Sequence, residues 1–138
     1  MKNLGSTFIV AALALAAGYG AGKMEAKSPR VFEMRTYTAH PGKLADLEAR
    51  FRNHTLKIFE KHGMKNIGYW VPQDEPLKSN TLIYILAHES REAAKKSWDA
   101  FREDPVWIKA RDASEVNGKL VAKVDSVFMD ATDYSPIK

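Results

Sequence analysis

The chain has 138 residues, 45% of them hydrophobic, which is enough for one domain with a substantial core. Its 21 basic and 17 acidic residues give a net charge of +4, and the two signs alternate along the predicted helices, which excludes a nucleic-acid-binding surface as the main function. Cysteine is absent, so disulfide bonds, thiol catalysis and thiolate metal sites are excluded as well.

An apolar run from Leu4 to Ala21 opens the chain, preceded by Lys2 and followed by the polar segment Lys23–Arg30. A positive start, an apolar centre and an exit through small residues are typical of a secretory signal peptide. The run is near the lower length limit of a membrane-spanning helix, so an uncleaved membrane anchor is the alternative. We predict an exported protein, periplasmic or secreted, whose leader and short linker are residues 1–26.

A strand is predicted from Val31 to Thr38. Successive side chains of a strand point to opposite sides of a sheet, which gives this strand one apolar face and one charged, aromatic face. The apolar face carries Phe32, Met34 and Thr36, and the opposite face carries Glu33, Arg35 and Tyr37.

Proline and glycine at positions 41 and 42 end this strand, and a helix is predicted from Lys43 to His62. Apolar residues recur there at spacings of three and four, which makes one continuous stripe on a helix of about five turns. The stripe consists of Leu44, Leu47, Phe51, Thr55, Ile58 and His62. Gly63 supplies the left-handed residue that commonly ends a helix.

Two further strands are predicted at Asn66–Val71 and Asn80–His88, joined by the polar loop Pro72–Ser79. The residues at the centre of the second of these strands are apolar on both faces. That pattern predicts a strand that is covered on both sides.

Another helix is predicted from its N-cap Ser90 through Arg102. Its buried face carries Ala94, Ser97 or Trp98, and Phe101. Asp104 and Pro105 have the N-cap and first-position pattern of a short additional helix, and Trp107 is expected to fold this helix back onto the core.

With a fourth strand at Lys119–Asp130, the mature domain 27–138 has the order β-α-β-β-α-β. This order predicts an α+β, ferredoxin-like fold, in which an antiparallel sheet has both helices on one face. We expect the face with Glu33, Arg35 and Tyr37 to lie on the uncovered side of the sheet. Monomers seldom expose so large an amphipathic surface, so we expect a homodimer in which two sheets pair and bury it.

Six short motifs in this order resemble the NIPSNAP domain of the dimeric α/β-barrel superfamily. They are Phe32–Tyr37 (FEMRTY), Pro41–Lys43 (PGK), Phe51–His54 (FRNH), Lys61–Gly63 (KHG), Gly68–Trp70 (GYW) and Asp104–Trp107 (DPVW). The resemblance runs from about Val31 to Pro136, nearly the whole mature chain.

The resemblance implies a barrel made from two ferredoxin-like subunits, in a family whose biochemical role is poorly defined. Related barrels include cofactor-independent monooxygenases, haem-degrading enzymes and lactone isomerases, which show what such a barrel can host without fixing the function. The best-known family members are mitochondrial or vesicle-associated. The leader of this chain departs from them and puts their trafficking roles in doubt here.

Glu33 and Arg35 lie on the same strand face, close enough for their side chains to interact. In one interpretation Arg35 is an anion anchor for a carboxylate or enolate ligand. In the other, the two residues form a structural ion pair that keeps both charges satisfied when they are buried.

His54 lies near the flank of the first helix's apolar stripe and is the candidate catalytic residue, either as a general base or, in a weaker alternative, as a haem ligand. In the alternative interpretation, His54 and His62 are both ordinary packing residues without a catalytic or ligand-binding role. No two histidines with an acidic partner have a recognised metal spacing, so no metal and no cofactor are expected.

Aromatic residues could line a pocket for a small apolar or aromatic ligand, although they are also the usual core residues. The candidates for ligand binding are Arg35, Tyr37, His54, Trp70, Tyr84 and Trp107. We expect the pocket between the sheet, the first helix and the Trp107 segment, with Arg35 and His54 approaching from opposite sides of the sheet.

The function that these observations favour is a small-molecule-binding or accessory module, with no stable membrane association after removal of the leader. The alternative is a cofactor-independent monooxygenase or isomerase that acts on an aromatic or enolisable substrate. In that alternative Arg35 holds an anion and His54 moves a proton. The chain has no P-loop, dinucleotide fingerprint, nucleophile elbow or zinc-protease motif.

Overall fold

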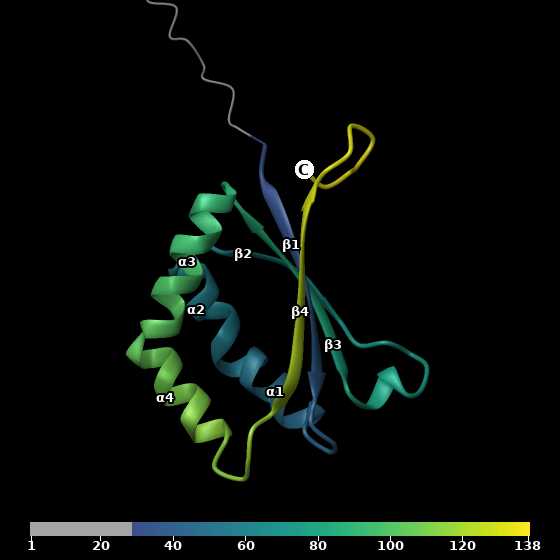
Figure 1. The fold of residues 1–138 in the computed structure, drawn as a ribbon, viewed down its shortest axis with the longest axis vertical. Helices are drawn as coiled ribbons and strands as arrows, with labels where there is room; N and C mark the ends of the chain where they lie inside the picture. Colours follow the sequence, from purple (N-terminus) through teal and green to yellow (C-terminus); the bar gives the residue numbers. More distant parts are fainter. Residues whose placement is uncertain (1–28) are drawn as a thin grey trace, which may run out of the picture.

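The structure is a computed structural model that describes residues 29–138, so the predicted leader lies outside the described residues. The described chain forms a four-stranded antiparallel sheet in the order β2-β3-β1-β4, with the α-helices packed on one face (Figure 1). The strands are β1 (Val31–Ala39), β2 (Lys65–Trp70), β3 (Thr81–His88) and β4 (Val121–Asp130). None of the described helices is long and apolar enough to cross a bilayer.

The helices confirm the predicted ferredoxin-like order. They are α1 (Leu44–Arg50), η1 (Phe51–Thr55), α2 (Leu56–Lys61), η2 (Leu77–Ser79), α3 (Arg91–Glu103) and α4 (Pro105–Ser114). The predicted caps are present, because the Ser90 hydroxyl accepts the Ala93 N–H at 2.9 Å and the Asp104 carboxylate accepts the Val106 N–H at 2.8 Å. Gly63 has a φ of 78°, the left-handed value expected at a helix end.

The segment η1 is a π-helix inside what the sequence predicts as one continuous α-helix. Thr55 donates its hydroxyl hydrogen to the Arg50 carbonyl at 3.3 Å within it. A π turn holds an extra residue, so the residues after it are rotated relative to α-helical register. Phe59 therefore lies on the buried side with Phe51, their ring centres 6.1 Å apart, while His62 lies at the edge of the core.

The prediction of which face of β1 lies under the helices is wrong. Glu33 is 1% exposed and accepts a hydrogen bond from Trp98 of α3, and Tyr37 packs against Phe51 of η1 with ring centres 5.7 Å apart. The charged, aromatic face of β1 therefore points toward the helices. The prediction failed because the donors that satisfy the buried carboxylate come from strands and helices distant in sequence.

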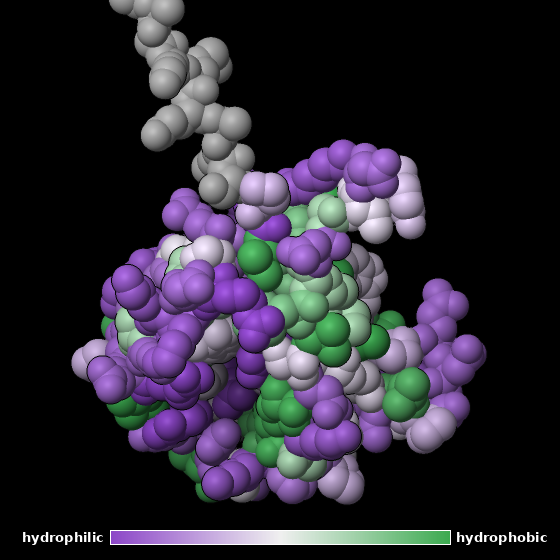
Figure 2. Space-filling view, turned by 45° about the horizontal axis from the view of Figure 1, so that its top comes forward, coloured by the Kyte–Doolittle hydropathy of each residue, from purple (hydrophilic) through white to green (hydrophobic). Residues whose placement is uncertain are grey.

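The uncovered face of the sheet is mostly apolar, since residues paired across neighbouring strands share a face. Lys123 and Asp125, at the start of β4, also lie on it and form an ion pair with each other. The apolar side chains on this face are Phe32, Met34, Ile83, Ile85, Val127 and Met129. Figure 2 shows mostly polar side chains over the helical side and apolar side chains gathered on the sheet side. Val127 is 51% exposed and Trp70, at the end of β2, is 52% exposed.

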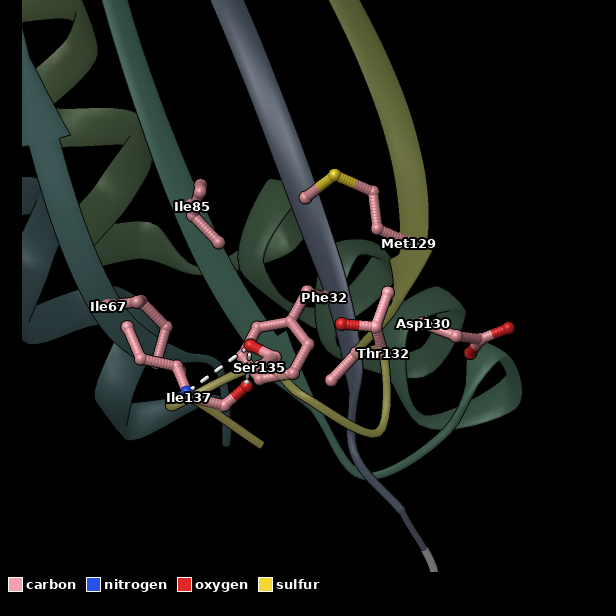
Figure 3. Close-up of a pocket in the computed structure, with 9 residues that line it drawn as sticks. Phe32, Ile67, Ile85, Met129, Asp130, Thr132, Ser135 and Ile137 are labelled. Carbon is pink, nitrogen blue, oxygen red and sulfur yellow. Dashed lines mark hydrogen bonds between the residues drawn. The ribbon is translucent and has the colours of Figure 1, made fainter.

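The C-terminal tail, residues 131–138, turns back over one end of this uncovered face (Figure 3). Ser135 and Ile137 of the tail lie beside Phe32, and the tail and sheet together line an open pocket of about 300 Å³. The tail explains why Phe32 is buried on a face that no helix covers.

Replacing Phe59 with alanine is expected to lower the free energy of unfolding by about 3–5 kcal/mol, because its ring is fully buried among other aromatic rings. Equilibrium urea unfolding measures this change. The matched control is Val106→Ala, at a side chain 55% exposed on α4, which should alter stability by less than about 0.5 kcal/mol. Equally small effects of both substitutions would contradict the placement of Phe59.

Candidate functional site

A fully buried carboxylate, Glu33 near the start of β1, lies on the helix-covered side of the sheet. One carboxylate oxygen accepts hydrogen bonds from Arg35 Nη1 and Ser126 Oγ, and the other accepts them from His88 Nε2 and Trp98 Nε1, all at 2.8 Å. These donors come from β1, β4, β3 and α3. Glu33 thereby connects three strands and a helix through one side chain.

Burial on its own would raise the pKa of Glu33, but the hydrogen bonds from its four partners outweigh burial and lower the pKa to about 2. Glu33 is therefore ionised at neutral pH and can only accept hydrogen bonds. His88 must carry its hydrogen on Nε2, the nitrogen that contacts the carboxylate.

The guanidinium of Arg35 has more N–H donors than it uses in its hydrogen bond to Glu33. Its guanidinium carbon lies 4.2 Å from the centre of the Trp98 ring, and Nη1 contacts Glu33. Its Nε is buried without a partner among the described residues, and the side chain is 17% exposed. An arginine has five N–H donors, so this stacked and oriented guanidinium can still bind an anion.

A cavity of about 500 Å³ lies between α3 and β4, next to this guanidinium. Its lining residues are Glu33, Arg35, Arg91, Glu92, Lys95, Trp98, Arg102, Ser126 and Phe128. Basic side chains outnumber acidic ones in this lining, and Arg91 stacks on Phe128 with its guanidinium carbon 3.8 Å from the ring centre. The cavity is therefore positively charged and has aromatic walls. We call it the α3 cavity.

None of the aromatic residues predicted for ligand binding, which are Tyr37, Trp70, Tyr84 and Trp107, lines the α3 cavity. Tyr84 is completely buried in the core, where burial raises the pKa of its hydroxyl well above the usual value, and it donates a hydrogen bond to the Tyr37 hydroxyl at 3.0 Å. Trp107 packs on Phe101 with ring centres 4.5 Å apart. Trp70 lies on the uncovered face instead. Core side chains fill the space near α1 and Trp107 where the sequence predicted the pocket.

His54 and Arg35 do not line the same cavity. His54 is exposed on η1 and lines a surface groove of about 360 Å³ between η1 and α4. The expectation that the sheet separates the two residues was wrong, because Arg35 also lies on the helical side. The groove at His54 has a mixed lining, in which Asp46 and Asn53 lie beside alanines and Val116, and this surface groove is not the flat apolar slot that haem requires.

Sequence reasoning missed His88, Trp98 and Ser126 as partners of Glu33. Each is polar or amphipathic, and each lies on the same face as Glu33 only after strand order and helix position are known. The sequence did offer a signal for a buried polar partner, because a histidine, His88, ends a mostly apolar strand. Among the described residues, no group of three or more histidine, aspartate or glutamate side chains could hold a metal ion.

The depressed pKa of Glu33 predicts a defined pH dependence of stability. A carboxyl with a pKa of 4.5 when unfolded and about 2 when folded contributes stability above pH 4.5, and this contribution is lost as the pH falls toward 2. Glu33→Gln should therefore be less stable than the wild type at neutral pH, and the difference should narrow as the pH falls from 4.5 to 2. Urea unfolding at several pH values measures it. A difference that stays constant through this range would contradict the lowered pKa.

The fold is shared with solved structures of low sequence identity. A nipsnap family protein of unknown function from Agrobacterium tumefaciens has a TM-score of 0.70 and 19% identity, over 80% of this chain and 96% of that one. A NIPSNAP-like domain protein from Burkholderia xenovorans has a TM-score of 0.68 and 17% identity, over 79% and 90%. SnoaB, a cofactor-independent oxygenase from Streptomyces nogalater, has a TM-score of 0.53 and 16% identity, over 78% and 98%.

A search of curated proteins found no match. The family model described as NIPSNAP, in contrast, matches residues 32–136, from the second residue of β1 through most of the C-terminal tail. This match includes every strand and helix described above, as well as the residues around Glu33. The chain therefore belongs to the NIPSNAP family.

Proposed function

We propose that the protein is an exported, homodimeric small-molecule-binding protein, and that the α3 cavity holds a flat aromatic anion such as a carboxylate or an enolate. The observation that carries this proposal is the partly exposed guanidinium of Arg35, which lines an accessible cavity. Export rests on the leader pattern of the sequence alone.

Arg35 is oriented before any ligand binds. Glu33 holds one end of the guanidinium and the Trp98 ring supports its flat side. Glu33 has no acceptor capacity left for further donors, because four groups already bind it. An incoming anion would therefore pair with Arg35 without competing for its contact with Glu33, and it would lose little free energy to side-chain ordering.

The size and walls of the α3 cavity define the ligand class. About 500 Å³ lies within the range of small-molecule sites. Trp98 and Phe128 provide apolar surfaces for a ring, and Arg91, Lys95 and Arg102 add positive charge at the rim. Asp99 binds both Lys95 and Arg102, which reduces their contribution. Arg35 is therefore the main anion anchor.

The uncovered sheet face supports the homodimer. Its apolar side chains extend across several strands, and monomers rarely leave so large an apolar surface in water. Pairing two such faces would bury the surface and close a barrel, with one α3 cavity in each subunit. This arrangement keeps the expected homodimer but replaces its predicted charged interface with an apolar one.

A cofactor-independent monooxygenase or isomerase is the second candidate, favoured by the shared fold of SnoaB. His54 lines a separate groove, so it cannot transfer a proton to or from a ligand in the α3 cavity. Oxygen uptake with hydroxylated aromatic acids, measured with an oxygen electrode, separates the candidates. Uptake that Arg35→Gln abolishes would favour the enzyme, and binding without uptake would favour the binding protein.

Val127→Glu should convert the dimer to a monomer, because it places a charge in the apolar interface at a side chain that is half exposed in the single chain. Light scattering at micromolar concentration measures the mass. Val106→Glu, at a similarly exposed position on α4, is the matched control and should remain dimeric. A wild-type monomer, or a dimer that survives Val127→Glu, would contradict pairing through this face.

A naphthalene carboxylate should bind the protein, whereas naphthalene methanol, the neutral analogue, should bind at least about tenfold more weakly. Arg35→Gln should weaken binding of the carboxylate by about 10- to 100-fold, because a hydrogen bond to a charged group contributes about 1.5–3 kcal/mol. Isothermal titration calorimetry measures both. His54→Ala is the control and should bind normally. Loss of binding in His54→Ala but not in Arg35→Gln would move the site to the groove on η1.

A further inference from the structure

Ser126 is a polar residue of the α3 cavity that the proposed function leaves unused. It lies near the middle of β4, is exposed in the single chain and lines the cavity. Its hydroxyl oxygen lies 2.8 Å from Oε1 of Glu33. Among the described residues, this is the only side-chain hydrogen bond that Ser126 makes. The remaining lone pairs of the hydroxyl oxygen are therefore open to a ligand.

The direction of this hydrogen bond is fixed by Glu33. An ionised carboxylate has no hydrogen to donate, and Glu33 is ionised at neutral pH because its pKa is lowered to about 2. The single hydrogen of the Ser126 hydroxyl therefore points to Glu33. Ser126 thus presents lone pairs, and no hydrogen, to a ligand in the α3 cavity. A ligand group beside Ser126 has to be a hydrogen-bond donor.

Arg35 and Ser126 offer a donor and an acceptor side by side at the cavity. The two residues are direct partners across β1 and β4. Arg35 Nη1 and Ser126 Oγ each lie 2.8 Å from the same oxygen of Glu33, so these two atoms lie within twice that distance of each other. One small ligand can therefore contact both side chains. It would offer an anionic oxygen to Arg35 and a hydrogen to Ser126.

We infer, on the basis of the proposed function of the α3 cavity, that its ligand is an aromatic acid that also carries a hydroxyl group. The carboxylate pairs with Arg35, and the hydroxyl donates a hydrogen bond to Ser126. The hydroxyl is meta to the carboxylate, because an ortho hydroxyl donates its hydrogen to the carboxylate of its own molecule and a para hydroxyl points away from it. Phe128 lies two residues after Ser126 on the same face of β4 and offers its ring to the aromatic part of the ligand.

Ser126 is the acceptor best placed for this hydroxyl. Glu33 already accepts four hydrogen bonds, so its oxygens are not available to a ligand. Glu92 is the other acidic residue of the lining, but it lies in the first turn of α3 and not beside Arg35 on the sheet. The remaining charged residues of the lining are basic and can only donate. Ser126 therefore determines the specificity for a hydroxyl, and Glu92 provides a control.

The first test compares three ligands by isothermal titration calorimetry with the wild-type protein. They are the naphthalene carboxylate, its meta-hydroxy derivative and its meta-methoxy derivative, which can accept a hydrogen bond but cannot donate one. The hydroxy derivative should bind about three- to tenfold more tightly than the unsubstituted acid, the effect of one neutral hydrogen bond, and the methoxy derivative should show no gain. An equal gain from both substituents, or no gain from either, would overturn the inference and leave the proposed function standing. No binding of any of the three would contradict both.

Variants then assign the gain to Ser126. Ser126→Ala should remove the preference for the hydroxy derivative, whereas the loss of its hydrogen bond to Glu33 should change the affinities of all three ligands alike. Ser126→Thr keeps the hydroxyl and should keep the preference. Glu92→Ala, in the same cavity, and Ser79→Ala, a matched substitution on η2, should keep it too. A preference that survives Ser126→Ala, or that is lost in Glu92→Ala, would overturn the inference. The ligand comparison needs no variant, so it decides the question even if Ser126→Ala does not fold.

Discussion

The buried carboxylate of Glu33 is the constraint on which the rest of the structure depends. Its four donors come from separate parts of the sequence, and they meet only if β1 lies between β3 and β4 with its charged face toward α3. Removing one partner would leave a polar group buried without a bond, which costs more than the bond itself contributes. The network therefore fixes which face of the sheet is inside.

Because the charged face of β1 points toward the helices, the candidate ligand site and the candidate dimer interface lie on opposite sides of the sheet. The helical side holds the buried carboxylate of Glu33, with Arg35 at the α3 cavity and His88 hydrogen-bonded to the carboxylate. The opposite side is left with apolar side chains suited to pairing with a second copy. An ionic interior beneath the helices and an apolar exterior on the sheet are thus two results of one strand orientation.

Local patterns predicted the order and bounds of the elements, the caps at Ser90 and Asp104, and the family. Each of these depends on residues close together in sequence. The orientation of β1 was not predictable in this way, because alternation defines two faces without saying which is buried, and the charged face looked like the outer one. The π turn at Phe51–Thr55 was not predicted either, and Phe59, which follows it, lies in the core with Phe51. The role of His88 in the network depends on its hydrogen bond with Glu33, which lies 55 positions away in the sequence.

The most direct test of this account is the titration of the Glu33 carboxyl itself. In protein labelled with ¹³C at the glutamate side-chain carboxyl, the resonance assigned by comparison with Glu33→Gln can be followed as the pH is lowered. The account predicts a midpoint near pH 2, well below that of the exposed glutamates. A midpoint near 4.5 would show that the carboxyl is solvated, and would contradict the buried network and the strand orientation that it fixes.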